Sequence, residues 1–183
     1  MSWKVLETEK IFELGYLKIR GEKCEMPDGR IMPRYFVVDF SDWVQVLPIT
    51  PEGEMVLVSQ YRHAAGVTCL ELPGGAMSLN NDEEPLEAGR RELLEETGFD
   101  SKEDYVSLGF HYPNPALQSN KVHGFLALNC EYVQKPELDP YEDLEVVKMP
   151  VKELYEKLER GEITHSLMVP TLVLAKKYLT EYF

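Results

Sequence analysis

Three glutamates lie close together in a segment with the pattern of an amphipathic helix, residues 85–97. At 100° per residue, Glu92, Glu95 and Glu96 fall within about 100° of one another on such a helix. Carboxylates gathered on one face repel each other unless cations lie between them, and Mg²⁺ or Mn²⁺ prefers hard oxygen ligands. A metal cluster of this kind neutralises phosphate charge and activates water, which is the chemistry that hydrolysis of a phosphoanhydride bond needs.

A glutamate-rich helix more often simply solvates a protein surface, so the helix alone does not establish a metal site. Two neighbouring features strengthen the case. The glycine pair Gly74-Gly75 gives a loop tight enough to turn a backbone carbonyl toward a metal. Arg91 lies one helical turn before Glu95 and can fix its orientation.

The ends and faces of this helix follow from local signals. Asp82 is the expected N-cap, and Gly98 is the expected stop. We expect the glutamate face to be exposed, with Ala88 leaving room among the carboxylates. Leu86 and Leu93 lie on the opposite side and should pack against a sheet.

Runs rich in β-branched and aromatic residues predict strands at 4–12, 17–24, 34–40, 44–50, 55–61, 105–111, 122–131 and 146–149. The turn signal Pro51-Glu52-Gly53 predicts that two of these strands form a hairpin. Further helices are expected at 151–160 and within 164–183, with Pro170 near the start of the last one. Strands and helices mix without strict β-α-β alternation, so the predicted fold is α/β, with a mixed sheet flanked by helices.

The overall composition excludes several classes of protein. The chain has 183 residues, enough for one ordinary domain, and its net charge of −13 argues against binding a nucleic acid polymer. Its longest apolar runs are too short for a membrane span, and its start lacks the apolar core of an export signal. Three widely spaced cysteines match neither a disulfide framework nor a zinc pattern, so we expect a cytoplasmic protein.

From Glu83 onward the sequence resembles the signature of the Nudix hydrolase family, G-x5-E-x7-R-E-U-x-E-E-x-G-U, where U is apolar. The match from this glutamate is complete and runs through Arg91, Glu92, Glu95, Glu96, Gly98 and Phe99. Upstream, seven residues rather than five separate Gly75 from Glu83. The two extra residues fall in the polar run 78–82, where a loop tolerates insertion.

The resemblance implies a fold and a set of roles. The family fold is an α/β/α sandwich around a mixed sheet, here at 41–183, preceded by an antiparallel β segment at 1–40. Glu92 and Glu96 would be the main metal ligands, with Glu95 as an additional ligand and catalytic candidate and the carbonyl of Gly74 as a backbone ligand. Supporting positions would be Gly75, Glu83, Arg91 and Gly98.

Residues outside the signature resemble the ADP-ribose pyrophosphatase branch of the family. These are the N-terminal β segment, the run from 56 to 62 followed by Leu70-Glu71-Leu72-Pro73, and Pro115, sixteen residues beyond Phe99. Pro-Gly-Gly replaces the Pro-Ala-Gly more usual in that branch. The resemblance makes Arg62, Glu71 and Pro115 substrate-binding candidates. A guanidinium fork can pair with phosphate oxygens, although Arg62 can equally be a surface residue.

A general base for the attacking water is expected in the acidic run 137–145. Glu142 matches the family pattern best, and Glu145 is the second candidate. Trp43 can either stack on adenine or pack in the core. We expect structural roles for His111, His123 and His165.

The predicted function is hydrolysis, with Mg²⁺ or Mn²⁺, of a nucleoside diphosphate joined to another group, with ADP-ribose giving AMP and ribose 5-phosphate. Nucleotide sugars, dinucleoside polyphosphates and damaged nucleotides are alternative substrates. A nucleotide sensor without activity is a further alternative. The resemblance also implies a homodimer formed through the N-terminal β segment.

Overall fold

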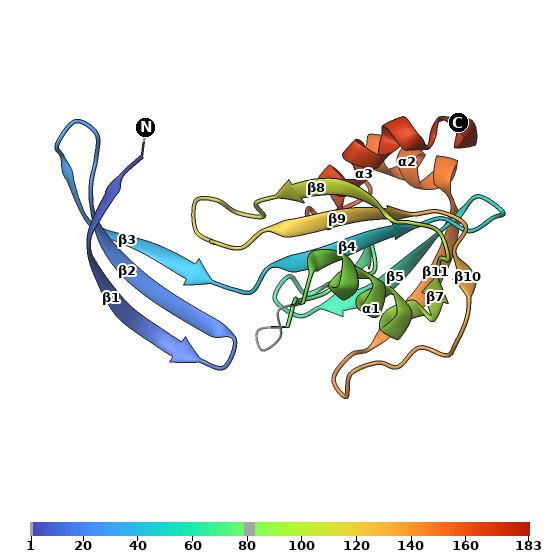
Figure 1. The fold of residues 1–183 in the computed structure, drawn as a ribbon, viewed down its shortest axis with the longest axis horizontal. Coiled ribbons are helices and arrows are strands. Elements are labelled where there is room, and N and C mark those ends of the chain that lie inside the picture. Colours follow the sequence, from blue (N-terminus) through green and yellow to red (C-terminus); the bar gives the residue numbers. More distant parts are fainter. Residues whose placement is uncertain (1, 79–82) are drawn as a thin grey trace. The chain divides into compact units, whose positions relative to one another are not determined.

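The computed structural model describes residues 2–78 and 83–183 (Figure 1). The chain forms two compact units. The first runs to Asp42 and also contains Tyr112–Lys121, and the second comprises Trp43–His111 and Val122–Phe183. In the described ranges, each helix is too short or too polar to cross a membrane.

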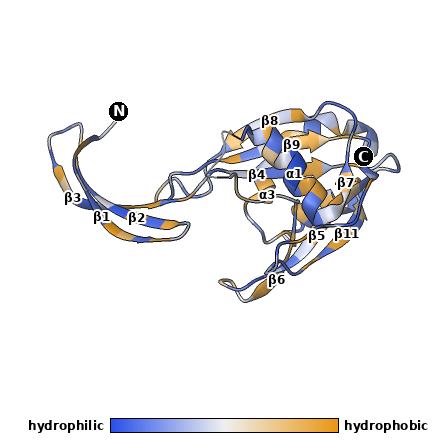
Figure 2. Cartoon of the chain, turned by 60° about the horizontal axis from the view of Figure 1, so that its bottom comes forward, coloured by the Kyte–Doolittle hydropathy of each residue, from blue (hydrophilic) through white to orange (hydrophobic). Residues whose placement is uncertain are grey.

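The first unit is built on a three-stranded antiparallel sheet of β1 (Lys4–Leu14), β2 (Leu17–Glu25) and β3 (Ile31–Asp39), with β2 in the centre. Every residue of β1 is exposed. Figure 2 shows hydrophobic and hydrophilic residues interspersed along these strands. This unit therefore presents a long edge strand that includes apolar side chains.

Two three-stranded sheets form the second unit. In one, β4 (Trp43–Pro48) pairs in parallel with β9 (Val122–Ala127), which pairs antiparallel with β8 (Val106–His111). In the other, β5 (Glu54–Arg62) lies between β11 (Leu144–Pro150) and β6 (Val67–Glu71), and all pairs are antiparallel. A short pair joins β7 (Phe99–Asp100) to β10 (Glu131–Tyr132).

The predicted hairpin of β4 and β5 is wrong in its pairing, although its turn is present. Gly53 has φ +77°, the backbone N–H of Thr50 donates to the carbonyl oxygen of Glu54, and Ile49 forms a β-bridge with Met55. Beyond that bridge the strands separate into different sheets. The pairing of β4 with β9, distant in sequence, replaces the local one.

Helices cover both faces of the mixed sheet β4-β9-β8. Gly89 of α1 (Pro85–Thr97) lies against Phe125, whereas Thr171 of α3 (Met168–Ala175) lies against Gly124. Phe125 and Gly124 are consecutive residues of β9, so their side-chain positions lie on opposite faces of the sheet. Figure 1 shows α1 in front of the sheet, with α3 on its other side.

The bounds of α1 agree with the sequence prediction. Glu84 is the N-cap, and its backbone N–H donates a hydrogen bond to the carboxylate of Glu87 at 3.4 Å. Asp82, the predicted N-cap, lies outside the described residues. Gly98 ends the helix at φ +73°, where a Cβ would lie 2.0 Å from the carbonyl oxygen of Gln134.

The predicted faces of α1 are wrong. Leu86, expected to pack on the sheet, is 39% exposed, whereas Ala88 is fully buried and leaves no open space. Leu93 is buried as predicted, but Glu92 and Glu96 lie on the buried side too, at 9% and 4% exposure. The backbone N–H of Gly74 in the adjoining loop and the guanidinium of Arg91 make this burial tolerable, and helical periodicity cannot reveal these contacts.

The C-terminal region differs from the sequence prediction in two ways. The predicted strand 122–131 is interrupted after Ala127, and Asn129 takes a left-handed conformation at φ +53°. The predicted last helix is limited to α3, followed by the 3₁₀ turns η1 (Lys176–Tyr178) and η2 (Thr180–Tyr182). Helix α2 (Val151–Glu159) precedes α3, and both helices pack into the main core. This core includes Leu154 of α2 and Leu172 of α3, together with Leu47, Leu57 and Leu126.

Candidate active site

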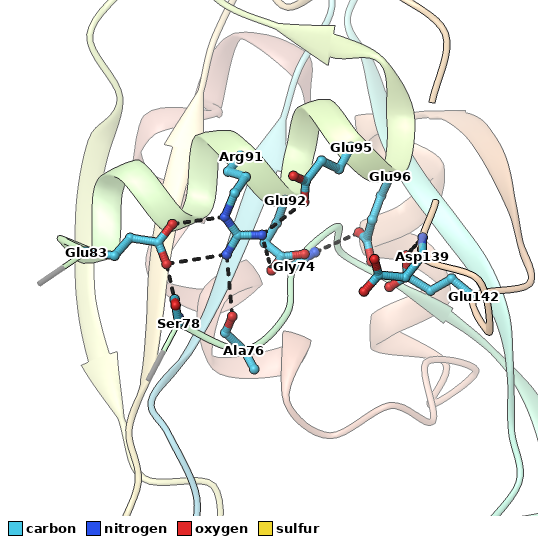
Figure 3. A network of polar contacts seen from close by, with 10 residues as sticks. All are labelled: Gly74, Ala76, Ser78, Glu83, Arg91, Glu92, Glu95, Glu96, Asp139 and Glu142. Atoms are coloured by element: carbon cyan, nitrogen blue, oxygen red, sulfur yellow. Dashed lines mark hydrogen bonds and ion pairs between the residues drawn. The ribbon is translucent and has the colours of Figure 1, made fainter. Parts of the chain in front are cut away.

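Arg91 binds three glutamates at once (Figure 3). Its Nε donates to Glu83 Oε1 at 2.9 Å, and its Nη1 donates to Glu92 Oε1 and to Glu95 Oε2, each at 2.9 Å. Glu83 also accepts a hydrogen bond from the backbone N–H of Ser78 at 3.0 Å. The hydrogen bond that Arg91 donates to Glu83 is the largest cause that raises the pKa of Arg91, and it also lowers the pKa of Glu83. The arginine therefore joins the segment before α1 to the glutamates on the helix.

Glu92 and Glu96 form a buried pair of carboxylates one turn apart. Burial raises the pKa of Glu92 to about 7, against the opposing charge of Arg91. Burial likewise raises the pKa of Glu96 to about 8, although its Oε2 accepts a hydrogen bond from Gly74 N at 2.9 Å. The negative charge of Glu92 further raises the pKa of Glu96, that of Glu95 raises the pKa of Glu92, and that of Glu142 raises both. The protein alone thus leaves these two carboxylates short of positive charge.

The loop that faces these carboxylates is fixed to β4. The carbonyls of Pro73 and Gly75 accept hydrogen bonds from Val46 and Val44, both at 2.9 Å. Gly74, between them, directs its N–H to Glu96 instead. The carbonyl of Gly74, the predicted backbone ligand, belongs to the same loop residue.

Neither glycine of this loop has room for a side chain. A Cβ on Gly74 would lie 2.1 Å from the carbonyl oxygen of Val44. A Cβ on Gly75 would lie 2.7 Å from the carboxylate carbon of Glu92. The glycine pair thus lets the loop approach both β4 and α1.

The donor set suits a hard divalent cation. Among the described residues, no three Asp, Glu, His or Cys side chains already converge as a metal site. Mg²⁺ commonly needs only one or two carboxylates, with water and substrate phosphate oxygens completing its shell. The buried pair Glu92 and Glu96, with the Gly74 carbonyl, meets that requirement.

Two cavities border this loop. One, of about 430 Å³, has a wall that includes Trp43, Arg62, Glu71, Gly74, Glu96, Glu142 and His165. The other, of about 570 Å³, is lined by Glu83, Arg91, Glu92, Glu95, Glu137, Asp139 and Glu142 among others. Gly75, Ala76 and Glu142 border both. The larger cavity is lined mainly by carboxylates around Arg91, whereas the smaller one offers Arg62 and the aromatic ring of Trp43. Glu95 borders only the larger one.

The two candidates for the general base lie in different surroundings. Glu142 borders both cavities, and its Oε2 accepts a hydrogen bond from the backbone N–H of Asp139 at 3.0 Å. Its charge acts on Glu92 and Glu96, as their raised pKa values indicate. Glu145 is exposed on β11, and neither cavity includes it.

Arg62 and Glu71, both predicted to bind substrate, bind each other in the cavity wall. Arg62 donates through Nε at 2.7 Å and through Nη2 at 2.5 Å to the two carboxylate oxygens of Glu71. Glu71 is only 2% exposed, and its carboxylate raises the pKa of Arg62. In this bidentate pair, Nη1 is the guanidinium nitrogen of Arg62 that donates no hydrogen bond to Glu71.

Pro115 is exposed in Tyr112–Lys121, the segment that belongs to the first unit. Sequence reasoning also missed two residues: Asp139, whose backbone holds Glu142, and His165, which lies beside Glu71. Asp139 was recognisable only as part of an acidic run, and His165 had no pattern around it.

Known proteins similar to this chain share its organisation. Residues 42–172 match the NUDIX domain, and residues 3–38 match the nucleoside diphosphate sugar hydrolase N-terminal domain. An ADP-ribose pyrophosphatase of Bacillus subtilis (strain 168) is 32% identical over 87% of this chain and 85% of its own length. A second ADP-ribose pyrophosphatase, from Mycobacterium tuberculosis, is 30% identical over 92% of this chain and 78% of its own length.

Two further similarities cover nearly the whole chain. A methanol dehydrogenase activator of Bacillus methanolicus is 27% identical over 96% of this chain and 91% of its own length. The crystal structure of an ADP compounds hydrolase superposes with a TM-score of 0.83 at 21% identity, over 99% of this chain and 96% of that one. The last similarity, together with the family match, confirms the predicted α/β fold with its mixed sheet.

Proposed function

The chain belongs to the NUDIX family, as its signature predicted, and from this premise we propose that it is a divalent-metal-dependent hydrolase that cleaves ADP-ribose to AMP and ribose 5-phosphate. The relatives named as ADP-ribose pyrophosphatases match it over most of its length, which supports the choice of substrate. The observation on which the proposal mainly rests is the buried pair Glu92 and Glu96 between two cavities.

Metal binding is assigned to the oxygens around this pair. Glu92, Glu96 and the carbonyl of Gly74 would hold Mg²⁺ or Mn²⁺, and Glu95 would contribute from the larger cavity. A divalent cation there would neutralise phosphate charge and lower the pKa of a bound water. Arg91 keeps Glu92 and Glu95 in place through hydrogen bonds to both.

Glu142 is our candidate for the general base. A base has to reach the proton of the attacking water directly or through one further water. Glu142 borders both cavities, and the hydrogen bond from Asp139 N fixes its orientation. Glu145 lacks this position, so we assign it no role in the reaction.

The smaller cavity is proposed to bind the nucleotide. Trp43 in its wall offers a flat apolar face for adenine. Arg62, oriented by Glu71, has a donor left for a phosphate oxygen. Pro115 remains a substrate-binding candidate through family resemblance alone.

The N-terminal sheet is proposed to pair with a second copy of the chain. Its edge strand β1 exposes Val5, Leu6, Ile11, Phe12 and Leu14 to solvent. Exposed apolar side chains on a free edge favour association with another surface. We place the protein in the cytoplasm because its three cysteines are all free and buried.

The proposal is tested by incubating the protein with ADP-ribose and Mg²⁺ and separating the products by chromatography. We expect AMP and ribose 5-phosphate in equal amounts, and a higher kcat/KM for ADP-ribose than for nucleoside triphosphates or nucleotide sugars. A higher kcat/KM for one of those alternatives would contradict the substrate and leave the family assignment intact.

A further inference from the structure

Glu142, the candidate for the general base, is the last residue of a four-residue turn that begins at Asp139. The backbone N–H of Glu142 donates to the carbonyl oxygen of Asp139 at 2.9 Å, which is the bond that closes such a turn. In return, the backbone N–H of Asp139 donates to Oε2 of Glu142 at 3.0 Å (Figure 3). The first and last residues of the turn are therefore joined twice, once through the backbone and once through the carboxylate of the base.

The turn receives little support from packing. Leu138, Asp139, Pro140 and Tyr141 are all exposed, and Tyr141 is fully so. A segment with few buried side chains opens easily, because no contact with the core has to break. The direction of the half-buried carboxylate of Glu142 thus depends on the local hydrogen bonds and on the residue types of the turn.

Two fixed points border the turn. Before it, the backbone N–H of Glu137 donates to the carbonyl oxygen of Glu95 at 2.8 Å, near the C-terminal end of α1. After it, β11 begins at Leu144, which pairs with Gln60 of β5. The turn is therefore the part of the connection whose shape determines where the carboxylate of Glu142 lies relative to α1, the helix with the candidate metal ligands.

Pro140 occupies the second position of this turn. Its ring fixes φ at about −65°, the value that the second position of the common turn types requires. A proline there also reduces the number of conformations of the open segment, so less entropy is lost when the turn closes. Pro140 borders neither cavity, so contact with substrate is not its role.

We propose that Pro140 is a positioning residue, whose ring keeps the turn from Asp139 to Glu142 closed and so holds the carboxylate of Glu142 in the orientation that takes a proton from the attacking water. A general base has to lie within hydrogen-bond reach of that proton, and a displaced carboxylate lowers the rate. This inference rests on the proposed function and adds to it a residue that affects the rate without touching substrate.

Substitutions of two prolines test the role of the ring. Pro140→Gly replaces the most restricted residue of the turn with the most flexible one. Pro136→Gly is the matched control, at an exposed proline of the same loop that lies outside the turn and borders neither cavity. Each substitution is made both in the unsubstituted protein and in Glu142→Gln, and kcat, KM and melting temperature are measured with ADP-ribose and Mg²⁺.

We expect Pro140→Gly to lower kcat by about threefold to tenfold in the unsubstituted protein, with KM changed by less than about twofold. In Glu142→Gln the same substitution should change kcat by less than about twofold, because no base remains to be positioned. Pro136→Gly should change kcat by less than about twofold in both proteins. An equal loss of kcat from Pro140→Gly in both would refute the inference, since the proline would then act independently of Glu142. So would an unchanged kcat.

Amide hydrogen exchange measures closure of the turn without substrate. The N–H of Glu142 is bound to Asp139, so Pro140→Gly should speed its exchange by about threefold to tenfold and leave the N–H of Glu137 unchanged. An unchanged exchange rate at Glu142 would contradict the inference alone. Absence of ADP-ribose cleavage by the unsubstituted protein would contradict the proposed function, and the inference with it.

Discussion

Gly75→Ala tests whether the position of Glu92 matters for catalysis. The new Cβ would lie 2.7 Å from the carboxylate carbon of Glu92, 2.7 Å from its Oε2 and 2.8 Å from its Oε1. Ordinary contact between such atoms begins at about 3.5 Å, so the carboxylate has to retreat by roughly 0.7 Å or more. All three close atoms belong to the far end of one side chain, so the backbone can stay in place.

The cost to stability should be small and the cost to catalysis large. Retreat weakens the hydrogen bond from Arg91 Nη1, which joins partly exposed groups and contributes about 1 kcal/mol. For a chain of this size that loss lowers the melting temperature by about 2–4 °C. A displacement approaching 1 Å in a catalytic group costs on the order of 10²-fold in rate. We therefore expect kcat with ADP-ribose to fall between about 30-fold and 100-fold.

The assay measures kcat at saturating Mg²⁺ together with the melting temperature. Gly74→Ala is the contrasting variant, because its Cβ would meet the backbone oxygen of Val44 at 2.1 Å. That clash cannot be relieved by rotating a side chain, so Gly74→Ala should lower stability by about 3 kcal/mol or more. If Gly75→Ala keeps kcat within about threefold of the unsubstituted protein, the position of Glu92 is not needed for the reaction.

Three further predictions follow from the site. Glu142→Gln should lower kcat by about 10²-fold to 10⁴-fold, whereas Glu145→Gln should change it by less than about threefold. Equal losses of kcat in the two variants would contradict the assignment of Glu142 as the general base. Arg62→Ala leaves the buried carboxylate of Glu71 without its arginine and should lower the free energy of unfolding, measured with urea, by about 2–4 kcal/mol. Adding Glu71→Gln to the same chain should restore part of that free energy. Excess chelator should abolish hydrolysis, and added Mg²⁺ or Mn²⁺ should restore it; full turnover in chelator would exclude a metal role.

The sequence predicts best what local chemistry determines. The bounds of α1 follow from Pro85 at its start and Gly98 at its end, both of which act within one turn of the helix. The separation of β4 from β5 depended instead on the distant partner strand β9. A local turn signal contains no information about that competition.

In the candidate site, too, the sequence identifies some residues, whereas the surroundings of others depend on the fold. The family spacing identified Glu92 and Glu96, but periodicity assigned them to solvent, because it cannot detect the Gly74 N–H and Arg91 that bind them. Glu142 and Glu145 were indistinguishable in an acidic run until the fold put only Glu142 beside the cavities. The pairing of Arg62 with Glu71 depends on the register between β5 and β6, which the sequence does not specify.

The comparison of Glu96→Gln with Glu87→Gln tests the central claim most directly. Both residues lie on α1, but Glu96 is buried beside the cavity and Glu87 is exposed. The amide keeps an oxygen that can accept the hydrogen bond from Gly74 N and removes the charge that would balance a cation. With ADP-ribose at saturating Mg²⁺, we predict that Glu96→Gln lowers kcat by about 10³-fold without lowering the melting temperature, and that Glu87→Gln leaves both unchanged. Near-normal kcat in a folded Glu96→Gln protein would contradict the assignment of a metal site to this helix.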